Sequence, residues 1–223
     1  IELPPRGKIP PYHLSPHKKP ATIQVDQSPM EGKLSDLRPI ELLQVRRTPL
    51  QNLYNSLIEQ YHYLRYTRPV GEHLEYLALA QGRVVACLGW CSAPRHIGCR
   101  DRYLGWTQEQ RVKNLCRIVI NTRFLILPWV KVPHLASHLL GLMARRIPRD
   151  WQEIYHHEVV WLETFVDPER GFSGTCYKAA NWIFLGQTTG RGKNDQTSRQ
   201  NRSLKDVLGY PLKREFREAL YGQ

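Results

Sequence analysis

Apolar residues recur along the first half of the chain at two spacings, and each spacing predicts a type of element. From residue 49 to 63 they recur every three or four positions, the period of an α-helix, and Thr48 stands where an N-cap would lie. Two further runs, 74–80 and 83–91, flank Gln81-Gly82, where the glycine can take the positive φ of a tight turn. The first half therefore predicts one helix followed by a β-hairpin.

The second half alternates between strand and helix signals. The strand signal ends at Pro128, because proline cannot donate to a β-ladder. After an irregular stretch at 96–106, the pattern predicts a short helix at 107–116, a central strand at 121–127, a helix at 135–147, a buried strand at 159–166, a helix at 174–184 and a C-terminal helix at 205–221 interrupted near Pro211. This alternation predicts an α/β fold with a mixed sheet flanked by helices.

The two ends of the chain differ in composition from its middle. Residues 1–38 carry repeated prolines and basic side chains without an apolar period, which predicts a flexible, Pro-rich basic arm. We expect the α/β domain at 39–192, and a basic linker with a short C-terminal helix at 193–223. A chain of 223 residues can bury one good core but scarcely two.

The net charge of the chain indicates which classes of molecule it is expected to bind. Lys plus Arg number 32 against 20 Asp plus Glu, which gives a net charge of +12 and favours polyanions such as DNA or RNA. The longest apolar runs fall far short of the roughly 20 residues that cross a bilayer, so no membrane partner is expected. The five cysteines are scattered and no leader pattern is evident, which favours a cytoplasmic protein without disulfides.

The order hairpin, strand, turn, helix, strand, helix resembles that of the GCN5-related N-acetyltransferase fold. In that fold the strand before the main helix splays from its neighbour, and the next turn binds the pyrophosphate of acyl-CoA through backbone N–H groups. The matching turn runs from Lys131 to Ala136, and these two residues fit the pattern as cofactor-binding positions. His134 stands in place of a glycine, and Pro133 has no N–H to donate. Tyr177 matches the tyrosine near the leaving thiol, so the resemblance implies a catalytic acid there.

A second resemblance runs from about residue 34 to 220 and rests on six segments that follow one another in order: Tyr61-His62-Tyr63-Leu64, Arg100-Asp101 with Leu104-Gly105-Trp106, Asn121 to Trp129, Leu135-Ala136-Ser137, Glu163 to Asp167, and Gly174 to Trp182. Together they resemble the family of the Druantia anti-phage system protein DruA. Arg65 departs from the family pattern, which tends to have glycine there. The resemblance implies a bacterial protein of phage defence or of mobile elements, because similar domains also stand beside transposase domains, and it implies defence or transposition proteins as further partners. It implies no known reaction.

Three carboxylates, Asp101, Glu163 and Asp167, are candidates for a catalytic set, since metal-dependent phosphodiester chemistry uses converging carboxylates and Mg²⁺. Glu163 and Asp167 share one face of a predicted strand but lie roughly 13 Å apart along it, too far for one ion unless the chain bends. Arg100 beside Asp101 predicts an ion pair instead. His156, His157 and Glu158 complete no ligand pattern, and no metal site is assigned.

The segment from Gly186 to Lys193 is rich in glycine but lacks the Gly-Lys-Ser/Thr of an ATP-binding loop. Its amides and the basic side chains around it suit nucleic-acid phosphates, although a solvated charged linker would have the same composition. The predicted nucleic-acid-binding residues are Arg191, Lys193, Arg199, Arg202 and Lys205.

Three functions are consistent with the sequence. The first is a DNA-binding protein of phage defence or mobile elements, with a degenerate acyltransferase-like fold as its scaffold. The second is an acyl-CoA-dependent N-acyltransferase that uses Tyr177 as acid, although the sequence favours Tyr177 and Trp182 as ordinary packed aromatics. The third is a Mg²⁺-dependent nuclease or strand-transfer enzyme using the three carboxylates. The cofactor, and whether the protein is an enzyme at all, stay open.

Overall fold

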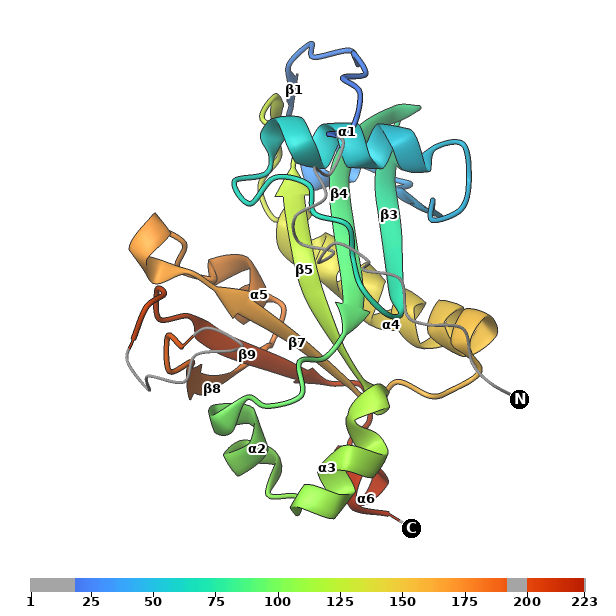
Figure 1. Ribbon diagram of the computed structural model, residues 1–223. Coiled ribbons are helices and arrows are strands. Elements are labelled where there is room, and N and C mark those ends of the chain that lie inside the picture. Colours follow the sequence, from blue (N-terminus) through green and yellow to red (C-terminus); the bar gives the residue numbers. More distant parts are fainter. Residues whose placement is uncertain (1–18, 192–199, 223) are drawn as a thin grey trace, which may run out of the picture.

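A seven-stranded mixed sheet forms the centre of the computed structural model, which describes residues 19–191 and 200–222. Its strands are β2 (Glu41–Gln44), β3 (His73–Ala80), β4 (Arg83–Ser92), β5 (Ile118–Ile126), β7 (Trp161–Val166), β8 (Ile183–Gln187) and β9 (Asp206–Pro211). They lie in the order β2-β3-β4-β5-β7-β9-β8, and every neighbouring pair is antiparallel except β5 and β7 (Figure 1). The predicted mixed α/β class is therefore confirmed.

Helices cover both faces of the sheet. They are α1 (Gln51–Tyr61), α2 (Gly98–Leu104), α3 (Gln108–Asn114), α4 (Leu135–Tyr155), α5 (Thr175–Ala179) and α6 (Phe216–Tyr221). Figure 1 shows α1 in front of β3, β4 and β5, and α4 behind them. Apolar residues of α4 such as Leu139, Met143 and Ile147 are fully buried, as the helical period predicts. The main core therefore lies on both sides of β3–β5.

A second, smaller core packs under the other end of the sheet, among α2, α6 and β7. Trp161 on β7 contacts Phe216 of α6 with ring centroids 4.8 Å apart, and Leu104 and Leu220 are fully buried beside them. Gly209 on β9 makes room for this packing, because a Cβ there would lie 2.0 Å from the Trp161 ring. The lower half of the sheet is thus fixed by a tryptophan that requires glycine opposite it.

Several elements differ from the sequence prediction. The segment predicted as a C-terminal helix contains strand β9 before the short helix α6, and the predicted helix at 174–184 is divided into α5 and strand β8. Helix α4 continues through Pro148 to Tyr155, well past the predicted end. No pattern of apolar residues predicted strand β2 or helix α2. The predicted hairpin is confirmed as β3 and β4, with Gln81 and Gly82 at positive φ in its turn.

The N-terminal segment is attached to the domain over residues 19–38, where the sequence predicted a flexible arm. The Ile23 N–H donates to Ser56 Oγ of α1 at 2.7 Å, and Arg83 donates to the Ser28 carbonyl at 2.7 Å. Strand β1 (Met30–Glu31) pairs in parallel with β6 (Val130–Lys131), and Met30 is buried. Residues 1–18 of the predicted arm lie outside the described residues.

Candidate functional site

A cavity opens where β5 and β7 part. The two strands pair from Ile118 opposite Trp161 to Asn121 opposite Thr164, and no pairing continues beyond these residues. A cavity of about 540 Å³, the splay cavity, lies between the diverging strands. Its walls come from both strands, from the end of α1, from residues 171–174 and from the start of α5. This is where the sheet leaves room for a ligand.

A hydrogen-bonded cluster closes the deep end of the splay cavity. Tyr177 on α5 donates its hydroxyl to Asn121 Oδ1 at 2.6 Å, and Thr164 Oγ1 donates to the Asn121 carbonyl at 3.3 Å. The Asn121 amide donates to the carbonyls of Gly89 and Arg123, both at 3.0 Å. Burial raises the pKa of Tyr177 well above its ordinary value, so the hydroxyl stays protonated at neutral pH. Its single proton already has an acceptor, which favours a structural role.

Three aromatic rings in contact with one another line the entrance of the splay cavity, and we call them the aromatic mouth: His62, Tyr63 and Phe172. The centroids of His62 and Tyr63 are 4.7 Å apart, and those of Tyr63 and Phe172 are 4.8 Å apart. The Arg170 guanidinium lies 5.3 Å from the Tyr63 centroid. Burial, with a smaller effect of the Arg123 charge, lowers the pKa of His62 to about 4, so its ring is neutral at pH 7.

Asp167 lies directly after β7 and lines the same cavity, although only 2% of its surface is exposed. Its Oδ2 accepts a hydrogen bond from Ser203 Oγ at 2.9 Å and lies 3.5 Å from Arg170 Nε. Its Oδ1 is buried and has no hydrogen-bond partner among the described residues. A buried acceptor without a donor is costly, which marks Asp167 as a residue suited to a ligand that donates.

The basic segment predicted to bind nucleic acid forms the connection between β8 and β9, residues 188–205, which we call the β8–β9 loop. Arg191 and Arg202 are exposed and Lys205 is half-buried, whereas Lys193 and Arg199 lie outside the described residues. The Gly190 carbonyl accepts from the N–H groups of Asn201 and Arg202, at 3.0 and 2.9 Å, and closes the described base of the loop.

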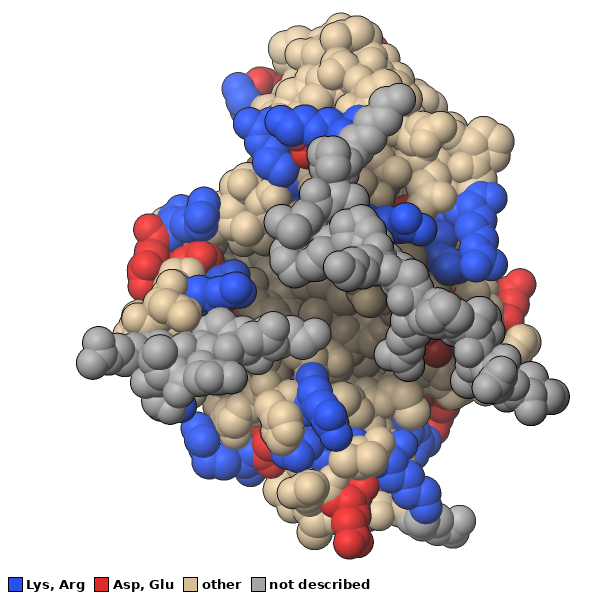
Figure 2. All heavy atoms as spheres, viewed as in Figure 1, with Lys and Arg blue, Asp and Glu red and all other residues tan. Residues whose placement is uncertain are grey.

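This loop is attached to the rim of the splay cavity. The Leu204 N–H donates to Glu169 Oε1 at 3.3 Å, and Ser203 is bonded to Asp167 as described above. Glu169 and Arg170 belong to the short 3₁₀ helix Pro168–Arg170, which leads into Phe172 of the aromatic mouth. Figure 2 shows this face of the molecule hollowed at its centre, with Lys and Arg side chains on several sides of the hollow. Basic side chains and the aromatic mouth therefore lie close together.

The three candidate carboxylates do not converge. Arg100 is fully buried and lies between two of them, 3.0 Å from Asp101 Oδ1 and 3.8 Å from Glu163 Oε1, which confirms the ion pair expected between Arg100 and Asp101. Asp101 also accepts from Trp106 and pairs with Arg111 at 3.3 Å. Asp167 takes part in a different set of contacts. No group of three or more Asp, Glu, His or Cys side chains in the described ranges could hold a metal ion.

Glu163 is the most perturbed of these groups. Its side chain is fully buried on β7, and neither carboxylate oxygen has a hydrogen-bond partner in the described part of the chain. Burial raises the pKa of Glu163 to about 7, against the opposing charge of Arg100. A carboxyl that is half protonated near neutrality is a poor ligand for Mg²⁺, so this residue does not support the nuclease hypothesis.

The histidines expected to complete no metal site have ordinary partners. His157 lies 2.9 Å from Glu72 and accepts from Trp151 at 3.4 Å. Glu158 is paired with Arg117 and Lys213. These contacts fix the chain between α4 and β7.

A second cavity of about 310 Å³ lies at the N-terminus of α4 and shares Ala136 and Cys176 with the splay cavity. This is the position of the turn expected to bind the pyrophosphate of acyl-CoA. His134 takes φ of 65°, the left-handed conformation that favours the glycine of the family pattern.

This turn has lost part of the donor set expected for a diphosphate. Pro133 has no N–H, the Leu135 N–H lies 3.3 Å from the Val132 carbonyl, and the Lys131 ammonium is paired with Glu31 at 3.1 Å. Lys131 lines neither cavity, so of the two predicted cofactor positions only Ala136 faces one.

Sequence reasoning found Tyr177 and Asp167 but not the aromatic mouth. Tyr63 belonged to one of the family segments, yet Phe172 and Arg170 carried no motif, because they meet Tyr63 only through the fold. The available signal was the glycine-flanked stretch Gly171 to Gly174, a type of loop that often surrounds a binding site.

The splayed parallel pair, with α4 as the helix that lies between its two strands in the chain, defines an α/β protein built on the acyltransferase-type sheet expected from the order of elements. The DruA model, described as Druantia protein DruA, matches residues 14–205. The chain belongs to the DruA family.

Comparison with solved structures finds acetyltransferases. One is an N-acetyltransferase from Staphylococcus aureus Mu50, with 12% identity, 78% of this chain and 97% of that chain covered, and a TM-score of 0.47. Another is the aminoglycoside acetyltransferase AAC(6')-Ib in complex with coenzyme A and kanamycin, with 14% identity, coverages of 81% and 98%, and a TM-score of 0.49. A third is the ribosomal-protein-S18-alanine N-acetyltransferase from Escherichia coli, with 9% identity, coverages of 78% and 94%, and a TM-score of 0.45. No curated protein matches the chain.

The helices give one further finding. None of those in the described ranges combines the length and the apolar content needed to cross a membrane.

Proposed function

We propose that this protein is a DNA-binding protein of bacterial phage defence or of mobile elements, in which the acyltransferase-like sheet serves as a scaffold. Membership of the DruA family supports the setting. The net charge of +12 supports a polyanionic partner. Other defence or transposition proteins are expected to act beside it in the cell.

The observation that carries the proposal is the placement of exposed cations on one rim. Arg191 and Arg202 of the β8–β9 loop are exposed and have no ion-pair partner among the described residues, and the loop is bonded to the helix that contains Arg170. Unpaired arginines on a surface loop are available to phosphates, and each contact releases counterions from DNA. Lys193 and Arg199, outside the described residues, are proposed to extend this surface.

The test is a DNA-binding titration by fluorescence anisotropy over a salt series, with Mg²⁺ present and absent. Replacing Arg191, Arg202 and Lys205 by alanine is expected to weaken binding and to lower the slope of log K against log salt by roughly 2 to 3. A control variant with alanine at Arg38, Arg145 and Arg149, which are also exposed, is expected to keep the native slope. Equal affinities of the two variants would contradict the proposed surface.

The same variants test the biological setting. In bacteria that carry the complete native gene cluster, plaque formation is expected to rise with the Arg191, Arg202 and Lys205 variant and to stay low with the control. The products of the titration, run on a denaturing gel, would expose a nuclease: Mg²⁺-dependent cleavage that Glu163→Gln abolishes would replace the scaffold proposal with the nuclease hypothesis.

A further inference from the structure

Contacts between surface arginines and DNA phosphates do not explain what the splay cavity binds. The sheet keeps an open cleft of about 540 Å³, within the range of roughly 300–1,000 Å³ typical of small-molecule sites, yet the turn beside it has lost part of the donor set for a diphosphate. The lining of the cleft indicates the chemistry of an occupant other than acyl-CoA.

The mouth of the cavity is aromatic and partly exposed. Among the large apolar side chains exposed in the described residues, three are aromatic: Tyr63 at 39%, Phe172 at 44% and Phe184 at 54%. Tyr63 and Phe172 are far apart in the sequence, but their rings are in contact, tilted by 40° with centroids 4.8 Å apart, and both line the cavity. Phe184, on β8, does not line it. Two partly exposed aromatic rings in contact at a cavity entrance form a surface on which a planar, aromatic ligand can stack.

Charge at the entrance favours a ligand that carries phosphate. Arg170 lies over Tyr63 and is exposed, and Arg202 is next in the chain to Ser203, whose hydroxyl is bonded to Asp167 in the cavity wall. A strand whose phosphates lie on these arginines would therefore pass directly over the entrance. An aromatic base attached to that strand is within reach of the mouth.

The cavity wall offers a hydrogen-bond acceptor. The Asp167 Oδ1 is buried without a donor in the described ranges, while Oδ2 is held in place by Ser203 and Arg170. Bases carry ring N–H or exocyclic amino groups, which donate to a carboxylate. A base thus has both properties that the cavity lining selects: a flat aromatic face and an N–H donor.

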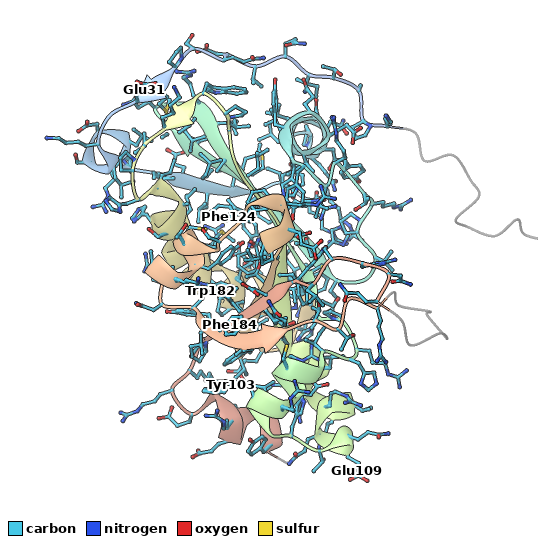
Figure 3. The ribbon with its side chains drawn as sticks, turned by 90° about the vertical axis from the view of Figure 1, so that its left-hand side faces the viewer. Glu31, Tyr103, Glu109, Phe124, Trp182 and Phe184 are labelled. Atoms are coloured by element: carbon cyan, nitrogen blue, oxygen red, sulfur yellow. The ribbon has the colours of Figure 1, made fainter. Side chains whose placement is uncertain are left out.

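We propose that the splay cavity receives a single unstacked base of a DNA strand, with Tyr63 and Phe172 as the stacking platform, Asp167 Oδ1 as the acceptor of a base N–H, and Arg170 and Arg202 on the flanking phosphates. This inference rests on the proposed DNA binding and specifies which DNA is bound: one with an unpaired base. Figure 3 looks onto the side of the molecule where Phe124, which lines the cavity, lies above Trp182 and Phe184.

The experiment compares a perfect DNA duplex with the same duplex carrying one bulged 2-aminopurine, whose fluorescence changes when its stacking changes. The native protein is expected to bind the bulged duplex more tightly and to change the 2-aminopurine signal. Tyr63→Leu with Phe172→Leu is expected to lower the affinity for bulged DNA about tenfold and to leave that for the perfect duplex unchanged, because stacking on aromatic side chains acts only on an exposed base. Asp167→Asn is expected to reduce the preference with the rings intact.

Phe184→Leu is the matched control, since it removes an exposed aromatic ring from outside the cavity and is expected to change neither affinity. If the native protein binds both duplexes equally and the 2-aminopurine signal stays constant, the base-binding inference is overturned while DNA binding stands. If neither duplex binds at low salt, the proposed function fails and the inference with it. Tyr63 and Phe172 are partly exposed, so their replacement by leucine leaves the core intact; thermal unfolding of each variant verifies this.

Discussion

The buried carboxyl of Glu163 makes a quantitative prediction about stability. The side chain lies fully inside the protein, 3.8 Å from Arg100, with no hydrogen bond to either oxygen from any described residue. Replacing it by glutamine keeps the shape and removes the charge. Because burial raises the pKa of Glu163 from 4.5 to about 7, the folded protein binds a proton more tightly than the unfolded chain does.

The sign follows from this difference. The contribution of Glu163 to stability is fully present below pH 4.5, where the carboxyl is protonated in both states, and is lost as the pH rises through 7. A shift from 4.5 to about 7 corresponds to about 3 kcal/mol at pH 8, since one pKa unit is about 1.4 kcal/mol. At pH 5.5 the loss is only about 1 kcal/mol by the same relation. Glu163→Gln is therefore expected to gain about 2 kcal/mol over the native protein between these two pH values.

Urea unfolding at pH 5.5 and at pH 8 measures this difference directly. Glu158→Gln is the control of opposite sign, because the Lys213 and Arg117 partners of Glu158 lower the pKa of that carboxyl, and its replacement is expected to destabilise the protein at pH 8. A stability difference between Glu163→Gln and the native protein that is the same at both pH values would refute the reasoning. It would mean that Glu163 is ionised throughout and paired with Arg100.

Two further predictions concern the cavities. Tyr177→Phe removes the hydrogen bond to Asn121 and is expected to lower the free energy of unfolding by about 1–2 kcal/mol, measured by urea unfolding. The DNA affinity, measured by anisotropy, is expected to stay unchanged. A large loss of function in a stably folded variant would instead indicate a catalytic acid. Acetyl-CoA is expected to produce no thermal shift, because in the turn at Lys131 to Ala136 one residue is a proline without an N–H and the Lys131 ammonium is paired with Glu31. A shift that Ala136→Trp abolishes would restore the acyltransferase hypothesis.

The sequence predicted the half of the sheet that is built from local signals. The β3–β4 hairpin has a glycine turn between two apolar runs, and the apolar residues of α1 and of the first part of α4 have helical spacing. Each of these elements can therefore be predicted from a short stretch of sequence. Strand β9 has no such signal, since it holds Gly209 and ends at Pro211, and it exists because β7 and β8 pair with it on both sides. The end of α4 was missed because Pro148 is normally a helix breaker.

The candidate site likewise has features that the local sequence predicts and features that depend on the fold. Arg100 and Asp101 are neighbours in the sequence, so their ion pair could be predicted, and the odd turn at His134 was visible against a family pattern. The aromatic mouth depends on the 3₁₀ helix after β7 folding back to the end of α1, a contact between distant segments that no local pattern encodes. The orphaned oxygen of Asp167 is likewise a property of the folded environment and not of the residue type.

The bulge on β5 determines how the shape of the cleft responds when the residues around it are replaced. The register between β4 and β5 shifts between Gly89 and Trp90, and the Asn121 amide satisfies the carbonyls of Gly89 and Arg123 at that point. These two backbone carbonyls at the bulge are therefore satisfied inside the sheet, without help from any occupant. A cleft whose backbone is held in this way keeps its shape when the residues around its entrance are replaced. The same opening can therefore come to bind ligands of unrelated chemistry without a change in the backbone.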